Sequence, residues 1–292
     1  MTKNKNHKAF SLIEISMVIL VIGILIAGVS QGIDLYDDYR LASARNLTKN
    51  SLVNRIPDLE LWFETTGENS LAMGTTTFTD KPNPTDLDRI GRWNDVNPNI
   101  LPTARNNATQ TASTNNQPQY IRKGMNGLPA LLFDGNDSLF YNGNFLVGSD
   151  YTIFVVEARN FKEFDNFFLS GTGSCGKNLR LGYKTDTTIM NDHFCQNMSK
   201  TIPAFSSTIA RIHSFTFASA LGKSIYTNGA GLISNSDKAN KNPLSGYPSS
   251  RIGGGSYKGY IAEIIIYSRA LTDKERQGVE AYLSKKWGIK LG

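Results

Sequence analysis

One carboxylate stands inside a long apolar run near the start of the chain. Residues 10–33 hold a single acid, Glu14, and no base. A carboxylate in a membrane-length apolar helix is strongly disfavoured unless it meets a positive charge, so an intramembrane acid is a functional hypothesis by default. A carboxylate and an ammonium that meet between packed helices need each other, because either one alone in hydrocarbon would be costly. We therefore expect Glu14 to act through an ion pair.

A second group of acids invites comparison with hydrolases. Asp58, Glu60 and Glu64 fall on one face of an expected strand, although Trp62 interrupts the series. Retaining glycoside hydrolysis needs two carboxyl groups about 5 to 5.5 Å apart. Solvent-facing acids on a first strand explain the same pattern. The three histidines are too few and too scattered for a metal site or a catalytic triad, so we expect no enzyme.

Two further sets of side chains could bind a ligand. Asp134, Asn136 and Asp137 offer oxygen ligands in a tight turn, as calcium would require. Asp134-Gly135 is also a strong hairpin signal, which explains the same residues without an ion. Aromatic side chains near expected strand ends could stack on sugar rings, or could simply cover the core. These aromatic candidates are Trp93, Tyr183, Tyr247 and Tyr257.

The elements that must position these residues begin with a helix. The stretch from residue 10 to Arg55 contains no proline and has a weak apolar stripe in its second half, so it predicts one long helix that ends before Pro57. Its uncharged part is long enough to cross a bilayer. Near the C-terminus, Thr272 and Glu275 form a capping box before a second helix, which ends at Gly288.

Between the two helices the sequence is typical of short strands. Leu59, Leu61 and Phe63 alternate with polar residues and predict a half-buried strand. Residues 67–126 are poor in apolar side chains, and we expect a long loop there with one short strand or turn at Trp93. Nine further strands are expected at 130–133, 138–141, 151–158, 166–170, 179–183, 187–190, 211–217, 223–227 and 260–267. This density predicts a sandwich or barrel.

Composition bounds the function classes. The chain has 292 residues and a formal net charge of +6, but removing Lys3, Lys5 and Lys8 of the first nine residues leaves +3. No basic stripe with interleaved aromatics is present, so nucleic-acid binding is not expected. After the N-terminal helix, about 230 residues remain, enough for one sizeable domain.

The N-terminal segment resembles that of type IV prepilins and pseudopilins. A basic leader ends at Ala9, where glycine is usual, and is followed by Phe10-Ser11-Leu12-Ile13-Glu14. The resemblance implies cleavage between Ala9 and Phe10 by a prepilin peptidase, methylation of the new Phe10 amine, and pairing of Glu14 with the N-terminal amine of a neighbouring subunit. An ordinary secretory signal cleaved near residues 27–30, or a plain membrane anchor, are the alternatives; neither requires Glu14.

The remainder, from residue 59 to 292, resembles bacterial jelly-roll domains of the concanavalin-A-like, laminin-G-like group. The resemblance rests on the order and spacing of several short motifs: 61–63, 91–95, 126–135, 259–267, 269–272 and 282–288. It implies a two-sheet antiparallel sandwich whose concave face and rim loops bind glycans or proteins, sometimes with calcium. Because fold alone does not establish binding, this stays an expectation.

The two cysteines, Cys175 and Cys195, lie in the part expected to be exported. An oxidising compartment favours a disulfide between them, and two buried thiols are the alternative. Closing a loop of this length would contribute roughly 3 kcal/mol.

Together these features predict a mainly β chain: a leader at 1–9, a long transmembrane helix at 10–56, and a jelly-roll domain at 57–292 closed by a C-terminal helix. The expected function is that of a minor pilin in a type IV pilus or related fibre, displaying the domain to a glycan or surface protein. Its partners would be other pilin subunits and the inner membrane, with the domain periplasmic before assembly. A type II secretion pseudopilin is the alternative, and an exported glycan-active enzyme is a third.

Overall fold

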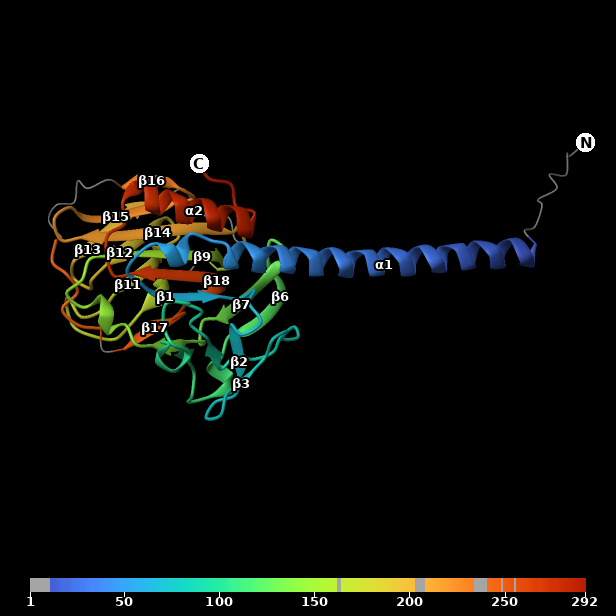
Figure 1. Ribbon diagram of the computed structural model, residues 1–292, viewed down its shortest axis with the longest axis horizontal. Coiled ribbons are helices and arrows are strands. Elements are labelled where there is room, and N and C mark those ends of the chain that lie inside the picture. Colours follow the sequence, from blue (N-terminus) through green and yellow to red (C-terminus); the bar gives the residue numbers. More distant parts are fainter. Residues whose placement is uncertain (1–10, 162–163, 203–207, 234–240, 248, 255) are drawn as a thin grey trace, which may run out of the picture. The chain divides into compact units, whose positions relative to one another are not determined.

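The computed structural model describes residues 11–161, 164–202, 208–233, 241–247, 249–254 and 256–292 (Figure 1). The chain divides into two compact units, residues 1–43 and 44–292. From Leu12 onward, the first unit is part of one helix. The second is a β-sandwich with a C-terminal helix, so the predicted fold class is confirmed.

Helix α1 runs from Leu12 to Lys49. Its apolar part has a mean hydropathy of 2.8 and is fully exposed, which gives it the length and composition of a membrane-crossing helix. The predicted end at Arg55 is wrong. The helix stops at Lys49, where the Asn50 side chain bonds back to the carbonyl of Asn46 at 2.9 Å, and a separate 3₁₀ turn, η1, follows at Val53–Arg55. Polar side chains that bond to nearby backbone compete with helix continuation.

The sandwich consists of two antiparallel sheets. In the eight-stranded sheet the order is β16 (Ala230–Ile233), β15 (Gly222–Thr227), β14 (Arg211–Ala218), β9 (Tyr151–Arg159), β18 (Lys258–Tyr267), β7 (Leu128–Asp134) and β6 (Gln119–Met125), with β1 (Leu59–Glu64) also paired to β18. The ten-stranded sheet has the order β13 (Asn197–Thr201), β12 (Thr188–Asp192), β11 (Arg180–Thr185), β10 (Asn166–Ser170), β17 (Ser250–Ile252), β8 (Leu139–Tyr141), β5 (Ala108–Thr109), β4 (Arg92–Trp93), β2 (Leu71–Met73) and β3 (Thr79–Asp80).

All the strands predicted after residue 126 are present, with ends shifted by at most a few residues. The prediction of a long loop at 67–126 is wrong in part. That segment supplies β2, β3, β4 and β5 to one sheet and β6 to the other, together with 3₁₀ turns η2 (Pro102–Ala104) and η3 (Thr114–Asn116). A further turn, η4, lies at Asn144–Leu146. The short strand expected at Trp93 is β4.

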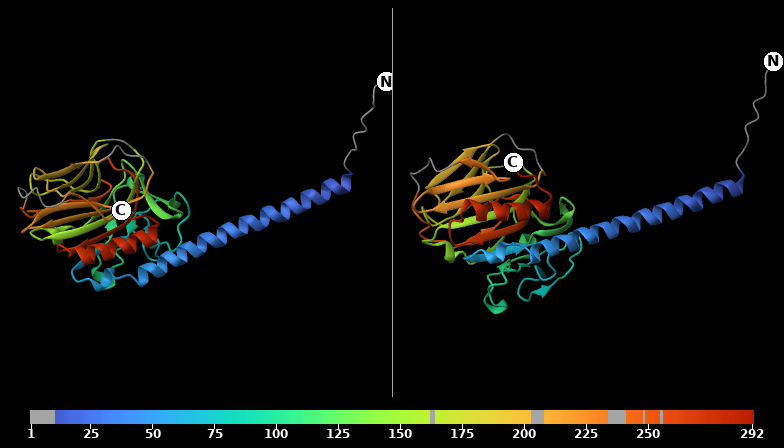
Figure 2. Two further views of the ribbon diagram at one scale, coloured as in Figure 1. Left: turned by 90° about the horizontal axis from the view of Figure 1, so that it is seen from above. Right: turned by 45° about the horizontal axis from the view of Figure 1, so that its top comes forward.

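Two apolar clusters hold the second unit together. The larger lies between the sheets and includes Leu61, Phe63 and Val155. The smaller lies on the outer face of the eight-stranded sheet, which α2 (Asp273–Trp287) covers (Figure 2). Because α2 covers it, β1 is buried on both faces, and the prediction of a half-buried strand is wrong.

The C-terminal helix ends as the sequence predicts. The Thr272 side chain and Glu275 form a reciprocal capping box at its start. Gly288 takes the left-handed conformation with φ of 62°, and its N–H donates to the carbonyl of Ser284. Glycine adopts this conformation without the strain that other residues suffer.

Candidate functional site

Glu14 lies in the first turn of α1 and is exposed. The N–H of Ser11 donates to Glu14 Oε2 at 2.8 Å, so the carboxylate satisfies a free backbone donor at the helix start. The helix dipole also favours a negative charge in this turn. The predicted cleavage residues, Ala9 and Phe10, lie outside the described residues. The geometry leaves the carboxylate of Glu14 accessible to a positive group from another chain.

A cluster of buried charges lies between β1, β18 and α2. Lys286 Nζ lies 3.0 Å from Glu64 Oε2 and 2.8 Å from Glu263 Oε2. Three neutral donors complete the shell of Glu263: Trp62 Nε1 at 2.7 Å, Tyr282 Oη at 2.8 Å and Trp287 Nε1 at 2.8 Å. We call these residues the Lys286 cluster. It links the first strand, the last strand and the C-terminal helix.

The electrostatics of Glu64 follow from its partners. Burial alone would raise the pKa of this carboxyl, but the charge of Lys286 and hydrogen bonds from Thr66 and Ser70 lower the pKa to about 2. For Lys286, burial opposes the charged form, yet the two carboxylates raise its pKa. A carboxyl that stays ionised in this way is a poor general acid, because that role needs a pKa near the working pH.

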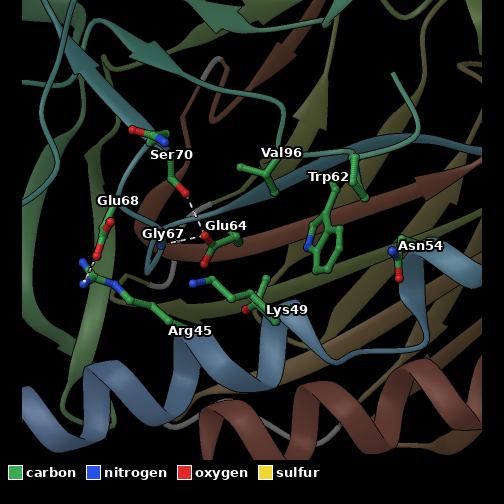
Figure 3. Close-up of a pocket in the computed structure, with 12 residues that line it drawn as sticks. Arg45, Lys49, Asn54, Trp62, Glu64, Gly67, Glu68, Ser70 and Val96 are labelled. Carbon is green, nitrogen blue, oxygen red and sulfur yellow. Dashed lines mark hydrogen bonds and ion pairs between the residues drawn. The ribbon is translucent and has the colours of Figure 1, made fainter. Parts of the chain in front are cut away.

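Beside this cluster a pocket of about 420 Å³ opens where the end of α1 packs on the sandwich. Figure 3 shows Arg45 and Lys49 of the helix on one side and Trp62 and Glu64 of β1 on the other. Arg45 is fixed by a 2.7 Å bond to the carbonyl of Thr66 and a 3.0 Å ion pair with Glu68. Most polar groups here bind each other, which fits a role in holding the helix end on the domain.

The three acids considered for hydrolysis, Asp58, Glu60 and Glu64, bind different partners. Asp58 precedes β1 and pairs with Arg269 at 3.4 Å. Glu60 accepts from the Ser268 hydroxyl at 2.6 Å. Glu64 belongs to the Lys286 cluster and is buried. Each carboxylate therefore has a separate partner.

The residues considered for calcium form a turn after β7. The N–H of Asn136 donates to Asp134 Oδ1 at 2.9 Å, and the N–H of Asp134 donates to Asp137 Oδ2 at 3.0 Å. Asp137 is buried and lies 3.2 Å from Arg89 Nη1. Burial raises the pKa of Asp137 to about 7. These bonds satisfy the carboxylates within the turn itself, and calcium binding stays a prediction.

The aromatic residues considered as sugar-stacking sites require a correction. Trp93, Tyr183 and Tyr257 are 0% exposed and Tyr247 is 2% exposed. Their polar atoms bind protein groups: Trp93 Nε1 donates to the carbonyl of Glu64 at 2.9 Å and Tyr247 Oη to the carbonyl of Ser170 at 2.8 Å. Their rings belong to the core between the sheets, although Tyr247 also lines a pocket beside Phe140.

The structure also brings together a polar group that sequence reasoning missed. Glu157 accepts from Tyr183 Oη at 2.8 Å and Tyr257 Oη at 3.1 Å, and its Oε1 lies 3.0 Å from His213 Nε2. Burial lowers the pKa of His213. The sequence pattern could have predicted this group. Glu157 follows Ile153 and Val155 on the inward face of β9, and a polar residue that points inward from an apolar strand needs hydrogen-bond partners.

The predicted disulfide is confirmed. Cys175 and Cys195 are joined with Cα atoms 5.1 Å apart. The bond connects the segment before β11 to the turn after β12, and thereby closes the end of the hairpin that these strands form.

Comparison with known proteins gives a family match for the N-terminal segment. Residues 4–30 match the model of the prokaryotic N-terminal methylation motif. The N-terminal segment therefore carries the type IV prepilin motif. No curated protein sequence matches the chain.

Solved structures with a similar fold share little sequence with this chain. Trypanosoma rangeli sialidase in complex with sialic acid has 13% identity and a TM-score of 0.50, covering 81% of this chain and 34% of the sialidase. Domain 4 of AbnA, a GH43 extracellular arabinanase from Geobacillus stearothermophilus, in complex with arabinotriose, has 15% identity and a TM-score of 0.49, covering 68% of this chain and 99% of that chain. The binding domain of Paraclostridial Mosquitocidal Protein 1 has 15% identity and a TM-score of 0.49, covering 79% of this chain and 55% of that chain. The chain spans about a third of the sialidase, and the similarity concerns the fold alone.

Proposed function

We propose that this chain is a minor pilin or pilin-like subunit of a type IV pilus or related fibre, and that its β-sandwich binds a glycan or a surface protein. The observation that carries the proposal is the methylation motif at residues 4–30, with Glu14 as the single acid on the apolar part of α1. A plain anchor has no use for that acid.

The proposed assembly step follows from electrostatics. Cleavage before Phe10 creates a new amine close to the helix start, and Glu14 offers a carboxylate one helical turn away. Two such helices packed together bring the amine of one chain to the carboxylate of the other. In hydrocarbon this pairing removes the cost that each isolated charge carries.

The proposed location follows from the same segment. The lysines of the leader stay cytoplasmic by the positive-inside rule, so the sandwich lies on the opposite side of the inner membrane before assembly. The disulfide between Cys175 and Cys195 fits an oxidising compartment. A domain of this bulk would crowd the repeating surface of a major-pilin fibre, which favours a minor component.

We propose a binding rather than a hydrolytic role for the sandwich. Asp58, Glu60 and Glu64 have separate partners, and the pKa of Glu64 is held at about 2. Glu64, held ionised, is unsuited to the role of the protonated acid in glycoside hydrolysis. A type II secretion pseudopilin remains the alternative, because its N-terminal motif is of the same type.

The test compares two acids on one helix. Glu14→Ala should insert into the membrane normally but enter fibres poorly, because the partner amine loses its counter-charge. Asp34→Ala is the matched control: Asp34 is exposed on the same helix, beyond the apolar run. Membrane fractions and sheared fibres are probed for both variants. Normal fibre incorporation of Glu14→Ala would refute the charge-pairing role.

A further inference from the structure

A second pocket, of about 510 Å³, lies at the ends of three central strands of the ten-stranded sheet. It is formed where β5 begins, β8 ends and β17 begins, since the antiparallel pairing of these strands brings those ends together. We call it the Arg105 pocket. The lining side chains used below are Arg105, Asn106, Asn107, Phe140, Asn142 and Asn144.

The asparagines of the Arg105 pocket form a fixed frame. Asn106 and Asn142 exchange two bonds, Asn106 Nδ2 to the Asn142 carbonyl at 2.6 Å and Asn142 N–H to Asn106 Oδ1 at 2.9 Å. Asn142 Oδ1 also accepts from the N–H of Asn144 at 3.1 Å, and Asn107 Oδ1 accepts from the N–H of Asp95 at 2.9 Å. The side-chain oxygens are thus used internally, while among the described residues the side-chain N–H groups of Asn107 and Asn142 have no protein acceptor.

The charge that lines the Arg105 pocket is positive. Among the described residues that line it, Arg105 is the single charged side chain. Arg105 Nε is covered and has no hydrogen-bond partner among the described residues. Asp95 attracts Arg105 electrostatically, but its carboxylate oxygens accept from the backbone N–H groups of Trp62, Asn97 and Asn106. A ligand rich in acceptor oxygens and carrying negative charge complements such a surface.

Three aromatic residues line the Arg105 pocket, Phe140, Tyr141 and Tyr247, and Phe140 is the exposed one. Phe140 is on the outer face of β8 and 40% exposed, unlike its buried neighbours Leu139 and Tyr141. An exposed ring beside fixed amide donors suits a sugar, whose C–H face packs on the ring while its hydroxyls accept hydrogen bonds. A peptide is less suited, because β5, β8 and β17 are interior strands and offer no free edge for strand addition.

We propose that the Arg105 pocket binds an acidic saccharide, with Arg105 facing the anionic group and Phe140 packing on a sugar ring. This site assignment rests on the proposed function, in which the sandwich is a binding domain. It names both the place and the ligand class: a sugar with a carboxylate or similar anionic substituent.

The test titrates the full-length chain in detergent with four probes: a galacturonic acid trisaccharide, a neutral galactose trisaccharide, a triglutamate peptide and inorganic phosphate. The acidic trisaccharide should bind about tenfold more tightly than the neutral one, as expected for one charge-assisted contact. Arg105→Gln should remove this difference, and Arg105→Lys should keep part of it. Phe140→Ala should weaken both trisaccharides by about fivefold.

Matched controls are available in the same chain. Arg55→Gln removes an exposed arginine outside the pocket, and Phe164→Ala removes a phenylalanine that is 72% exposed; neither should change binding. The proposal is overturned if no trisaccharide binds, if Arg105→Gln binds the acidic trisaccharide as well as the unchanged chain does, or if phosphate or triglutamate binds equally well. Fibre incorporation is measured in parallel, so a failed site with normal incorporation removes the ligand assignment and leaves the subunit role intact.

Discussion

Lys286 is held by two carboxylates at once, and all three side chains are buried. Removing one partner from a buried charged group is more harmful than removing a surface pair, because the remaining charges stay in a low-dielectric environment without compensation. The Lys286 cluster also joins residues from both ends of the domain. The side chain of Lys286 therefore links β1, β18 and α2.

We predict that Lys286→Met lowers the free energy of unfolding by about 3 kcal/mol or more, because Glu64 and Glu263 lose their cation. Lys285→Met is the control, since Lys285 is the exposed neighbour on the same helix. Chemical denaturation of both variants gives the comparison. A loss in Lys286→Met no larger than that in Lys285→Met would show that the cluster does not stabilise the domain.

We predict that buried His193 makes a pH-dependent contribution to stability. Burial lowers the pKa of His193 to about 3, so below pH 6.5 the unfolded chain takes up a proton there and the folded chain does not. The stability that His193 contributes is therefore fully present above pH 6.5 and is lost as the pH drops toward 3. Glu64, with a pKa of about 2, adds a further loss below pH 4.5.

His193→Gln isolates the histidine's share of this loss. Between pH 6.5 and 4.5 the free energy of unfolding should fall by about 2 kcal/mol less in the variant than in the wild-type protein. Taking the difference between the two proteins removes the effects of other groups, such as Asp137, that titrate in the same range. Equal slopes in the two denaturation series would contradict the assignment.

At the scale of elements, the sequence predicted the strands whose apolar residues alternate over several positions, such as β9 and β18. It also predicted α2, because capping by Thr272 is a local interaction. It did not predict β2, β3 or β5, which are only two or three residues long. Their pairing depends on distant strands, and local sequence carries little of that information.

The residues of the candidate sites were likewise predictable only where local sequence determines their role. Glu14 could be recognised from sequence because an acid in an apolar run is unusual wherever the chain folds. The burial of Trp93, Tyr247 and Tyr257 could not, because proximity to a strand end does not say which face a ring occupies. The Arg105 pocket was also missed, since three separate segments form it only after the sheet has assembled.

We predict that the disulfide stabilises the sandwich through the hairpin of β11 and β12. Replacing Cys175 and Cys195 together by serine should lower the free energy of unfolding by about 3 kcal/mol, because the unfolded chain regains the freedom of the closed loop. Thermal melting with and without a reducing agent measures it. The unchanged chain should respond to reductant and the double variant should not; an unchanged melting temperature after full reduction would refute the prediction.

At the scale of the whole molecule, two units with different surroundings share one chain. The first, residues 1–43, exposes an apolar helix that requires a membrane or packed helices around it. The second, residues 44–292, has its own core and a disulfide. The end of α1, from Ala44 onward, belongs to the second unit, so one continuous helix connects both. This arrangement suits a subunit that is held by its helix and binds through its sandwich.

The central claim, that the chain is processed and assembled as a pilin-like subunit, is tested most directly at its N-terminus. The measurement is the intact mass and N-terminal sequence of the protein recovered from membranes, in cells with and without the host's prepilin peptidase. We predict a product beginning with methylated Phe10 when the peptidase is present, and uncut Met1 when it is absent. Uncut protein in both, or a cut after the apolar run, would contradict the account.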